Sequence, residues 1–445
     1  MKLLLLRPYY GININSDFHG DLGIAEISPS IQPDLSLVYA ASIAKENNSV
    51  KLDVIDANTE KLLPADVMRR INKEYDYILL KAAAPTIKPD IEFARYIKRC
   101  FPSAKVIISG HVAKILKEWI KRNTQIDDVS EIPTENYVYK LINNSIDNIK
   151  LNEFPTLDYK LFPYRNFVDS DGRCRATIYM SRGCNMTCTY CPYKAFYGDS
   201  LEFRGTENTI NDIKHILELG ISNIQFRDQH FTSNRKSVID LCHNIQKQNL
   251  KFNWTCETRL ETLDIDLIDL MTDCGLNMIC FGVESASDET LRRYNRIKCD
   301  NNKMVELIKY LKKKHVKTLA FYIIGFPNDT WESIKATYDL SIYLRSDYAR
   351  FSIYVPPLCN YSNEINPDLF IPFENVLSVN PSKYLSREQL KFLQEQLTLM
   401  YYADIEGLNS SYEYHYINQK AFNRYAKKLR DRVENNSLIE LYMLL

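Results

Sequence analysis

The chain has 445 residues, of which 45% are hydrophobic and 25% are charged, so it is long enough for two or three domains with their own cores. It carries 56 basic and 56 acidic residues, and this balance disfavours partners recognised by overall charge, such as nucleic acid or an anionic membrane. The apolar opening Leu3–Leu6 is too short to span a bilayer and is predicted to be a buried strand.

Residues 1–145 alternate strand-like apolar runs with helical ones, which is the pattern of a parallel sheet covered by helices. The predicted strands are 2–6, 51–56, 77–81 and 105–109, and the predicted helices are 36–45, 91–100 and 112–121. Residues 146–174 contain prolines and an aromatic run, which favours a linker packed on the next domain.

The alternation restarts at residue 175, and six strand–helix units up to residue 358 predict a partial barrel of parallel strands. The strands are expected at 177–180, 223–227, 252–256, 278–282, 318–324 and 351–355, and the helices at 207–219, 238–248, 263–271, 289–294, 303–314 and 331–344. Sites in such barrels lie at the carboxyl ends of the strands, so the polar residues that follow these strands are the candidates for chemistry.

Three cysteines, Cys184, Cys188 and Cys191, share one short loop after the first barrel strand. Soft thiolate ligands at spacings of four and three favour a metal site. An ordinary iron–sulfur cluster takes four cysteines and a structural zinc takes four ligands, so the trio is one ligand short for either. A four-iron cluster on three thiolates would leave one iron open to bind a reacting molecule. The alternatives are a buried cysteine cluster and a zinc knuckle.

The other eight cysteines form no regular framework, and the total of eleven is odd. No signal peptide is recognisable at the start of the sequence. These features predict a reducing, cytoplasmic compartment in which most of the remaining cysteines are buried thiols.

The cysteine spacing, with Tyr190 before the third cysteine, resembles the signature of the radical S-adenosylmethionine (radical SAM) enzymes. The resemblance implies that Cys184, Cys188 and Cys191 hold a [4Fe-4S] cluster whose open iron chelates the amino and carboxylate groups of SAM. It also implies that the reduced cluster cleaves SAM to methionine and a 5′-deoxyadenosyl radical, which takes a hydrogen atom from the substrate.

The resemblance assigns further roles at the strand ends. Glu284 and Ser285 match the fourth-strand motif whose carboxylate accepts hydrogen bonds from the ribose hydroxyls, and Arg259 is expected to clamp the SAM carboxylate. The structural alternatives are a helix cap for Glu284 and an ion pair between Arg259 and Glu257 or Glu261.

Four more residues are candidates at this end of the barrel. Tyr190 and Gly325 resemble the elements that border the adenine. Asp228 and His230 follow the second strand and are candidate catalytic residues, as substrate contacts or proton donors, although ordinary loop contacts are the alternative.

The first 145 residues resemble the Rossmann-like, cobalamin-binding domain that precedes the radical SAM domain in one large subgroup. The matching pieces are Pro33–Ala41, Val54–Ala57 and Val106–His111. The Asp-x-His-x-x-Gly motif that supplies a cobalt ligand in many cobalamin modules does not occur, and Ser109-Gly110 replaces the usual Gly-Gly. His111 is either a cofactor contact or a solvated loop residue. The sequence leaves open both a cobalamin-loaded domain and a cofactor-free one.

Residues 359–445 are predicted to be mainly helical. A capping box at residues 386–389 starts a helix with apolar positions 390, 393, 397 and 400 on one face, and further helices are expected at 418–434 and 438–441. The tyrosines of this region are expected in a core or along a substrate pocket; they are Tyr401, Tyr402, Tyr412, Tyr414 and Tyr416.

The sequence therefore predicts a radical SAM enzyme, with cobalamin-dependent C-methylation of a small molecule or natural-product intermediate as the leading function. The alternatives are a cobalamin-independent rearrangement, dehydration, epimerisation or oxidation, in which Cys299 or Cys359 could donate a hydrogen atom, and an interaction module with a structural zinc. The expected partners are the small-molecule substrate and an electron donor such as flavodoxin or ferredoxin, with no membrane.

Overall fold

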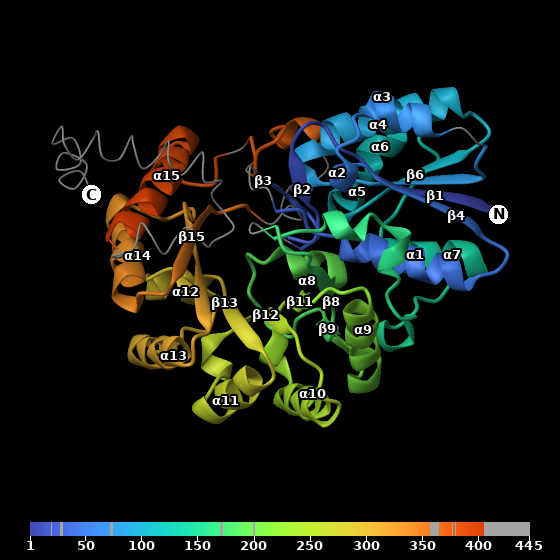
Figure 1. Cartoon of the computed structure of the whole chain (residues 1–445). Helices are drawn as coiled ribbons and strands as arrows, with labels where there is room; N and C mark the ends of the chain where they lie inside the picture. The colour runs from blue at the N-terminus through green and yellow to red at the C-terminus, as the bar shows by residue number, and fades with distance from the viewer. Residues whose placement is uncertain are drawn as a thin grey trace.

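The computed structural model describes residues 1–404 except 19, 27–29, 72–73, 170–171, 199–200, 357–364, 376 and 379. The N-terminal part is built on a parallel sheet with strand order β4-β1-β5-β6-β7 (Figure 1). Its strands are β1 Lys2–Arg7, β4 Lys51–Asp56, β5 Tyr77–Lys81, β6 Lys105–Ser109 and β7 Asp128–Val129. The predicted α/β class is confirmed, and among the strands of this sheet the two-residue β7 was missing from the prediction.

Helices cover both faces of this sheet, because successive side chains of each strand point to opposite sides. In β1, Leu3 and Leu5 join the core that contains α1, whereas Leu4 and Leu6 join the core that contains α4. The helices are α1 Leu35–Glu46, α2 Ala57–Glu60, α3 Pro64–Arg70, α4 Ile87–Cys100, α5 His111–Ile115, α6 Lys117–Asn123 and α7 Thr134–Asn143. The single helix predicted at 112–121 is wrong, since it is interrupted at Leu116, where α5 ends and α6 begins.

The second sheet has the order β15-β14-β13-β12-β11-β8, and all of its strands are parallel, as a partial barrel requires. Its strands are β8 Ala176–Ile178, β11 Asn223–Phe226, β12 Asn253–Thr258, β13 Leu276–Glu284, β14 Lys317–Ile324 and β15 Tyr348–Ile353. All six predicted strands are present, although β15 begins three residues earlier than expected.

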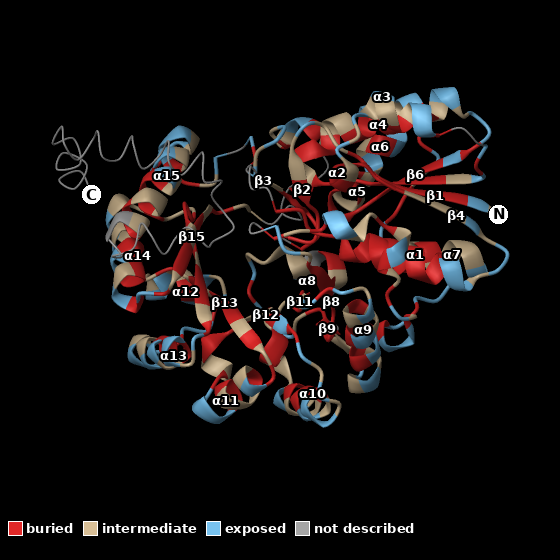
Figure 2. Ribbon diagram, in the orientation of Figure 1, coloured by how far each residue is buried: buried red, intermediate tan, exposed pale blue. Residues whose placement is uncertain are grey.

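The helices between these strands cover the outside of the barrel and expose one face each (Figure 2). They are α9 Thr206–Glu218, α10 Arg235–Lys247, α11 Ile265–Asp273, α12 Asp288–Arg293, α13 Asn301–Lys313 and α14 Trp331–Leu344. Each lies within a few residues of its predicted position, because apolar periodicity is a strong local signal.

Residues 146–174 form short 3₁₀ turns and bury several aromatic side chains in the core that is shared with the barrel. The predicted capping box is present: Gln389 N donates to Ser386 Oγ at 3.2 Å and Ser386 N to Gln389 Oε1 at 2.7 Å, at the start of α15 Arg387–Asp404. Tyr401 is buried and its hydroxyl donates to Ser346 O at 2.7 Å, as core packing predicts. Cys359 and the helices and tyrosines predicted after residue 404, including Tyr412, Tyr414 and Tyr416, lie outside the described residues.

The cysteine loop lies between the two parts of the molecule. It is framed by β9 Ser181–Arg182 and β10 Glu202–Phe203, which pair antiparallel, and it continues into α8 Pro192–Tyr197. The N-terminal part approaches α8 through the segment that contains the strands β2 Asn13–Asn15 and β3 Ile24–Glu26 (Figure 1). In the described part of the chain, no helix is both long and apolar enough to cross a bilayer.

Candidate active site

The three cysteines of the loop follow β8 and lie close enough to interact, since Cys184 and Cys188 both contribute to the raised pKa of Cys191. Cys188 is buried and Cys184 and Cys191 are partly buried. Burial raises the pKa of the Cys184 thiol and raises that of Cys191 to about 12, so both are protonated at neutral pH until a metal displaces their protons. Among the described residues no three His, Cys, Asp or Glu side chains gather as tightly as a single metal ion needs. A four-iron cluster binds its three thiolates on three different irons, so its ligands lie farther apart than those of a single zinc ion.

The start of the loop is fixed by two side chains that follow β11. The Asp228 carboxylate accepts hydrogen bonds from Met180 N at 3.1 Å, from Ser181 Oγ at 2.5 Å and from Ser181 N. Gln229 Oε1 accepts from Gly183 N at 2.7 Å. Asp228 is fully buried, and burial raises its pKa to about 7. These contacts support the alternative in which Asp228 orders the loop; its predicted substrate contact stays a prediction.

Two arginines and two glutamates lie beside the cysteines. Arg259 Nε donates to Glu261 Oε1 at 2.6 Å, and its Nη1 lies 4.0 Å from Cys188 Sγ. Arg296 Nη1 donates to the same Glu261 oxygen at 3.0 Å. Burial opposes ionisation of Glu261, but Arg296 and Arg259 outweigh it and lower the Glu261 pKa. The predicted ion pair of Arg259 with Glu261 is therefore present, and it holds the guanidinium against the cysteine loop.

Arg296 is a residue that the sequence analysis missed. Its Nη2 donates to Gly282 O at 2.5 Å, and its Nε lies 3.9 Å from Glu284 Oε1. The side chain is only 6% exposed, so these contacts are desolvated and strengthened. Arg296 thus links the end of β13 to Glu261 and Arg259.

Glu284 occupies a strained position at the end of β13. Its φ is 71°, a left-handed conformation that non-glycine residues rarely adopt, and the strand register shifts between Gly282 and Glu284. A Cβ atom at Gly282 would collide with the Glu284 carboxylate, so the glycine makes room for it. The helix-cap alternative is not observed, because Ser287 caps α12. The Glu284 carboxylate instead accepts a hydrogen bond from the hydroxyl of Tyr190 in the cysteine loop.

Aromatic rings line the same end of the barrel. Tyr190 lies 6.2 Å from Phe326 and 6.3 Å from Tyr294, and Tyr354 lies 4.8 Å from Phe326, all between ring centroids. Gly325 lies against α15, since a Cβ atom at this position would be 2.8 Å from the Leu390 side chain. The Gly325 N–H donates a hydrogen bond to the Asp329 carboxylate at 2.9 Å.

Ser285 and His230, which were also predicted as site residues, lie at the same end of the barrel. Ser285 is buried and its hydroxyl accepts from Ser287 N at 3.1 Å, toward α12. His230 is 2% exposed; its Nε2 lies 3.3 Å from Thr262 Oγ1, whereas its Nδ1 has no hydrogen-bond partner among the described residues. Burial lowers the His230 pKa to about 4, so the imidazole is neutral at pH 7.

The N-terminal part packs directly on the cysteine loop. A Cβ at Gly20 would lie 2.8 Å from the backbone nitrogen of Tyr193, two residues after the third cysteine. His111 stacks on Phe196 of α8 at 4.7 Å, and its Nδ1 lies 2.7 Å from Gly20 O. Burial lowers the His111 pKa to about 4, and the side chain is not a solvated loop residue. Both residues fix α8 against the first sheet.

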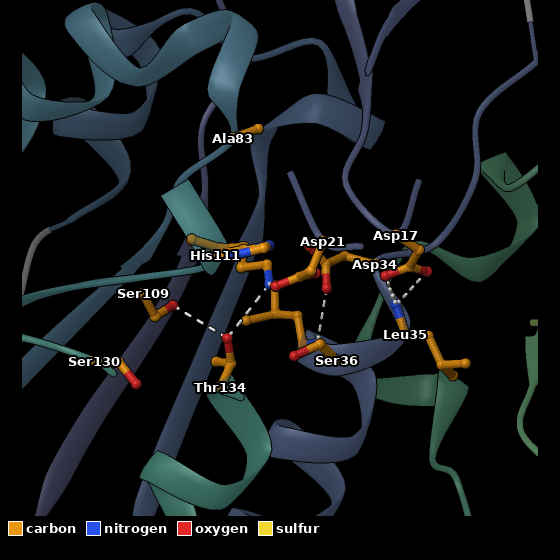
Figure 3. A network of polar contacts seen from close by, with 12 residues as sticks. Asp17, Asp21, Asp34, Leu35, Ser36, Ala83, Ser109, His111, Ser130 and Thr134 are labelled. Atoms are coloured by element: carbon orange, nitrogen blue, oxygen red, sulfur yellow. Dashed lines mark hydrogen bonds and ion pairs between the residues drawn. The ribbon is translucent and has the colours of Figure 1, made fainter. Parts of the chain in front are cut away.

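A buried polar network occupies the carboxyl ends of β5 and β6. Lys81 Nζ bonds Asp21 at 2.6 Å and lies 3.5 Å from Thr134 Oγ1, which in turn donates to Ser109 Oγ at 3.2 Å. Figure 3 shows Asp17, Asp21 and Asp34 on one side of this network and Ser109, Ser130 and Thr134 on the other. In doubly wound folds, ligands bind at the carboxyl ends of the strands, near the point where the strand order reverses.

The family model of the radical SAM superfamily matches residues 178–341, which hold the cysteine loop and the four barrel strands β11 to β14. An uncharacterized methyltransferase of Pyrococcus horikoshii is 25% identical over 438 residues, which cover 90% of this chain and 92% of that protein. The anaerobic magnesium-protoporphyrin IX monomethyl ester cyclase of Cereibacter sphaeroides is 23% identical, over 80% of this chain and 62% of that protein.

Two solved structures share the fold. The radical SAM methyltransferase TsrM from Kitasatospora setae, with cobalamin and a [4Fe-4S] cluster bound, has a TM-score of 0.63 at 13% identity and matches 79% of this chain and 72% of its own. The cobalamin-dependent radical enzyme OxsB, with aqua-cobalamin and SAM bound, has a TM-score of 0.62 at 16% identity, and the match covers 76% of this chain and about half (51%) of OxsB.

Proposed function

Because this chain belongs to the radical SAM superfamily, we propose that it binds a [4Fe-4S] cluster and SAM and methylates a carbon of a small organic substrate with the help of a corrinoid. The observation that carries the proposal is the convergence of the three cysteines, Arg259 and Glu284 at one end of the barrel. Relatives named as methyltransferases and structures with bound cobalamin support the methylation.

The residues of the site have separate tasks. Cys184, Cys188 and Cys191 would hold the cluster, which supplies the electron for SAM cleavage. Arg259 Nη1 already points to the cysteine loop and would bind the SAM carboxylate, while Glu284 would accept hydrogen bonds from the ribose hydroxyls. Cys188 and Arg259 are buried, and their low exposure to water strengthens the interactions that they make.

The buried polar network at the carboxyl ends of β5 and β6 offers hydrogen-bond acceptors of the kind that a corrinoid needs. Asp21 Oδ1 and Asp34 Oδ2 are buried and have no hydrogen-bond partner among the described residues. The corrin periphery carries several primary amides, which donate the hydrogen bonds that such oxygens lack. A corrinoid held here would carry the methyl group between SAM and the substrate carbon.

We expect Arg259→Lys to raise the dissociation constant for SAM about 10- to 100-fold, because charged hydrogen bonds contribute about 1.5–3 kcal/mol and lysine lacks the bidentate geometry. Anaerobic calorimetric titration of the cluster-loaded protein measures this change, with iron content as the check that the cluster is intact. The matched control is Arg235→Lys, which alters an exposed ion pair with Asp264 and should leave SAM binding unchanged. Wild-type affinity in Arg259→Lys would remove this residue from the SAM site.

The direct test of the proposed activity is SAM cleavage by reduced protein under anaerobic conditions. We expect 5′-deoxyadenosine and methionine to form only when both cluster and reductant are present. A fully loaded, reduced protein that leaves SAM intact would refute the proposal.

The cellular reductant proposed for this reaction is a flavodoxin or ferredoxin, which delivers single electrons. A cytoplasmic location is proposed as well, since all ten described cysteines are free thiols, as expected in a reducing compartment.

A further inference from the structure

We propose that Glu135 of the N-terminal part is a positioning residue for the iron–sulfur cluster, acting through Arg182 of the cysteine loop. Arg182 lies two residues before Cys184, and its Nη1 forms an ion pair with Glu135 Oε1. The two side chains are 5% and 1% exposed. The inference rests on the proposed cluster and adds to it a contribution from a helix of the N-terminal part, α7.

Arg182 stands at the start of the cysteine loop, and its guanidinium lies against the helix α8 that follows the loop. It lies 5.8 Å from the ring centroid of Tyr197, the last residue of α8, and 5.2 Å from that of Phe154. Since α8 follows Cys191 directly, the position of this one side chain affects the backbone on either side of the three cysteines. An arginine is suited to this task because its planar group stacks on rings and binds carboxylates at the same time.

Glu135 is itself firmly held. Its second oxygen, Oε2, accepts from Ser36 Oγ at 2.6 Å, so both carboxylate oxygens are engaged. It lies in the first turn of α7, where the helix dipole stabilises a negative charge. The preceding residue, Thr134, bonds Ser109 at the end of β6, as Figure 3 shows, and so ties the start of α7 to the sheet. The carboxylate is therefore a fixed point from which Arg182 is oriented.

A second carboxylate provides an internal comparison. Arg182 Nη2 also bonds Glu202 of β10 at 3.0 Å, but the Glu202 side chain is 34% exposed. Exposed ion pairs contribute little because water screens them, whereas removing one partner of a desolvated pair leaves a buried charge uncompensated. Of the two glutamates, Glu135 is expected to control the loop.

The test compares Glu135→Gln with Glu202→Gln in full-length protein purified without oxygen. Glutamine keeps the shape of the side chain and removes the charge. We expect Glu135→Gln to retain iron but to shift the midpoint potential and the electron paramagnetic resonance spectrum of the reduced cluster, because both depend on the surroundings of the thiolates. SAM cleavage should fall at least tenfold. Glu202→Gln should match the wild type in potential and spectrum and within twofold in rate.

The outcomes separate this inference from the proposed function. A wild-type chain that takes up no iron overturns both. A loaded wild type whose potential and spectrum are unchanged by Glu135→Gln overturns the inference alone. If Glu135→Gln does not fold, Ser36→Ala is measured instead, since it removes only the hydroxyl that orients the carboxylate; a shifted potential supports the inference and an unshifted one contradicts it.

Discussion

Replacing Cys188 with serine is expected to remove the iron–sulfur cluster and with it at least 99% of the reduction-dependent cleavage of SAM. Three thiolates are the minimum for a four-iron cluster with one open iron, and a hydroxyl is a harder, more weakly acidic ligand than a thiol. Cys188 is the buried member of the trio, and its sulfur is the one that faces Arg259. Iron and sulfide assays on anaerobically reconstituted protein, together with 5′-deoxyadenosine formation, measure both effects.

The matched control is Cys256→Ser. Cys256 is also buried, at 1% exposure, but it lies on β12 in the apolar core. Its replacement should reduce stability modestly and leave about four irons per chain in place. A Cys188→Ser protein with full iron content and undiminished SAM cleavage would show that the cluster is held elsewhere.

Asp228→Ala is expected to have the next largest effect, because it leaves the start of the cysteine loop without its acceptors. The substitution removes three hydrogen bonds and leaves Met180 N and Ser181 N buried without partners. Each such loss costs about 1–3 kcal/mol, which is enough to disorder the loop while the barrel stays folded. We expect less than half of the wild-type iron after reconstitution and at least a tenfold loss of SAM cleavage.

Asp347→Ala is the control for this effect. Asp347 likewise accepts from a backbone N–H and a hydroxyl of one residue, Thr318, at 2.9 and 2.7 Å, but at the opposite end of the barrel. It should lower the melting temperature without lowering the iron content. If the two variants lost iron in proportion to their loss of stability, Asp228 would have no specific role at the loop.

Local patterns predicted most of the fold. Strands such as β11 and helices such as α14 lie within one residue of the predicted bounds, since apolar periodicity and capping are properties of short segments. The cysteine spacing likewise identified the candidate cluster loop. Because sites in such barrels lie at the carboxyl ends of the strands, Arg259 and Glu284 were expected at the same end of the barrel as the cysteines. The structure places both of them beside the cysteine loop.

What the sequence did not predict depends on contacts between distant segments. Arg296 follows a short helix and precedes an exposed isoleucine, so nothing local marks it, yet its partners are 14 and 35 residues away. Glu135 lies 47 residues before Arg182, on the helix α7 of the N-terminal part. The position of Asp228 at a strand end was predictable, but the direction of its carboxylate, which faces the backbone of the cysteine loop, was not.

The most direct test of the proposed corrinoid-dependent methylation is the cofactor content of protein that is produced with abundant cobalamin and purified without oxygen. We predict about four irons and close to one corrinoid per chain, from metal analysis and the visible spectrum of the extracted corrinoid. A complete cluster without any corrinoid would contradict the methylation account. The N-terminal sheet would then be a scaffold, and the reaction would be a rearrangement, dehydration, epimerisation or oxidation.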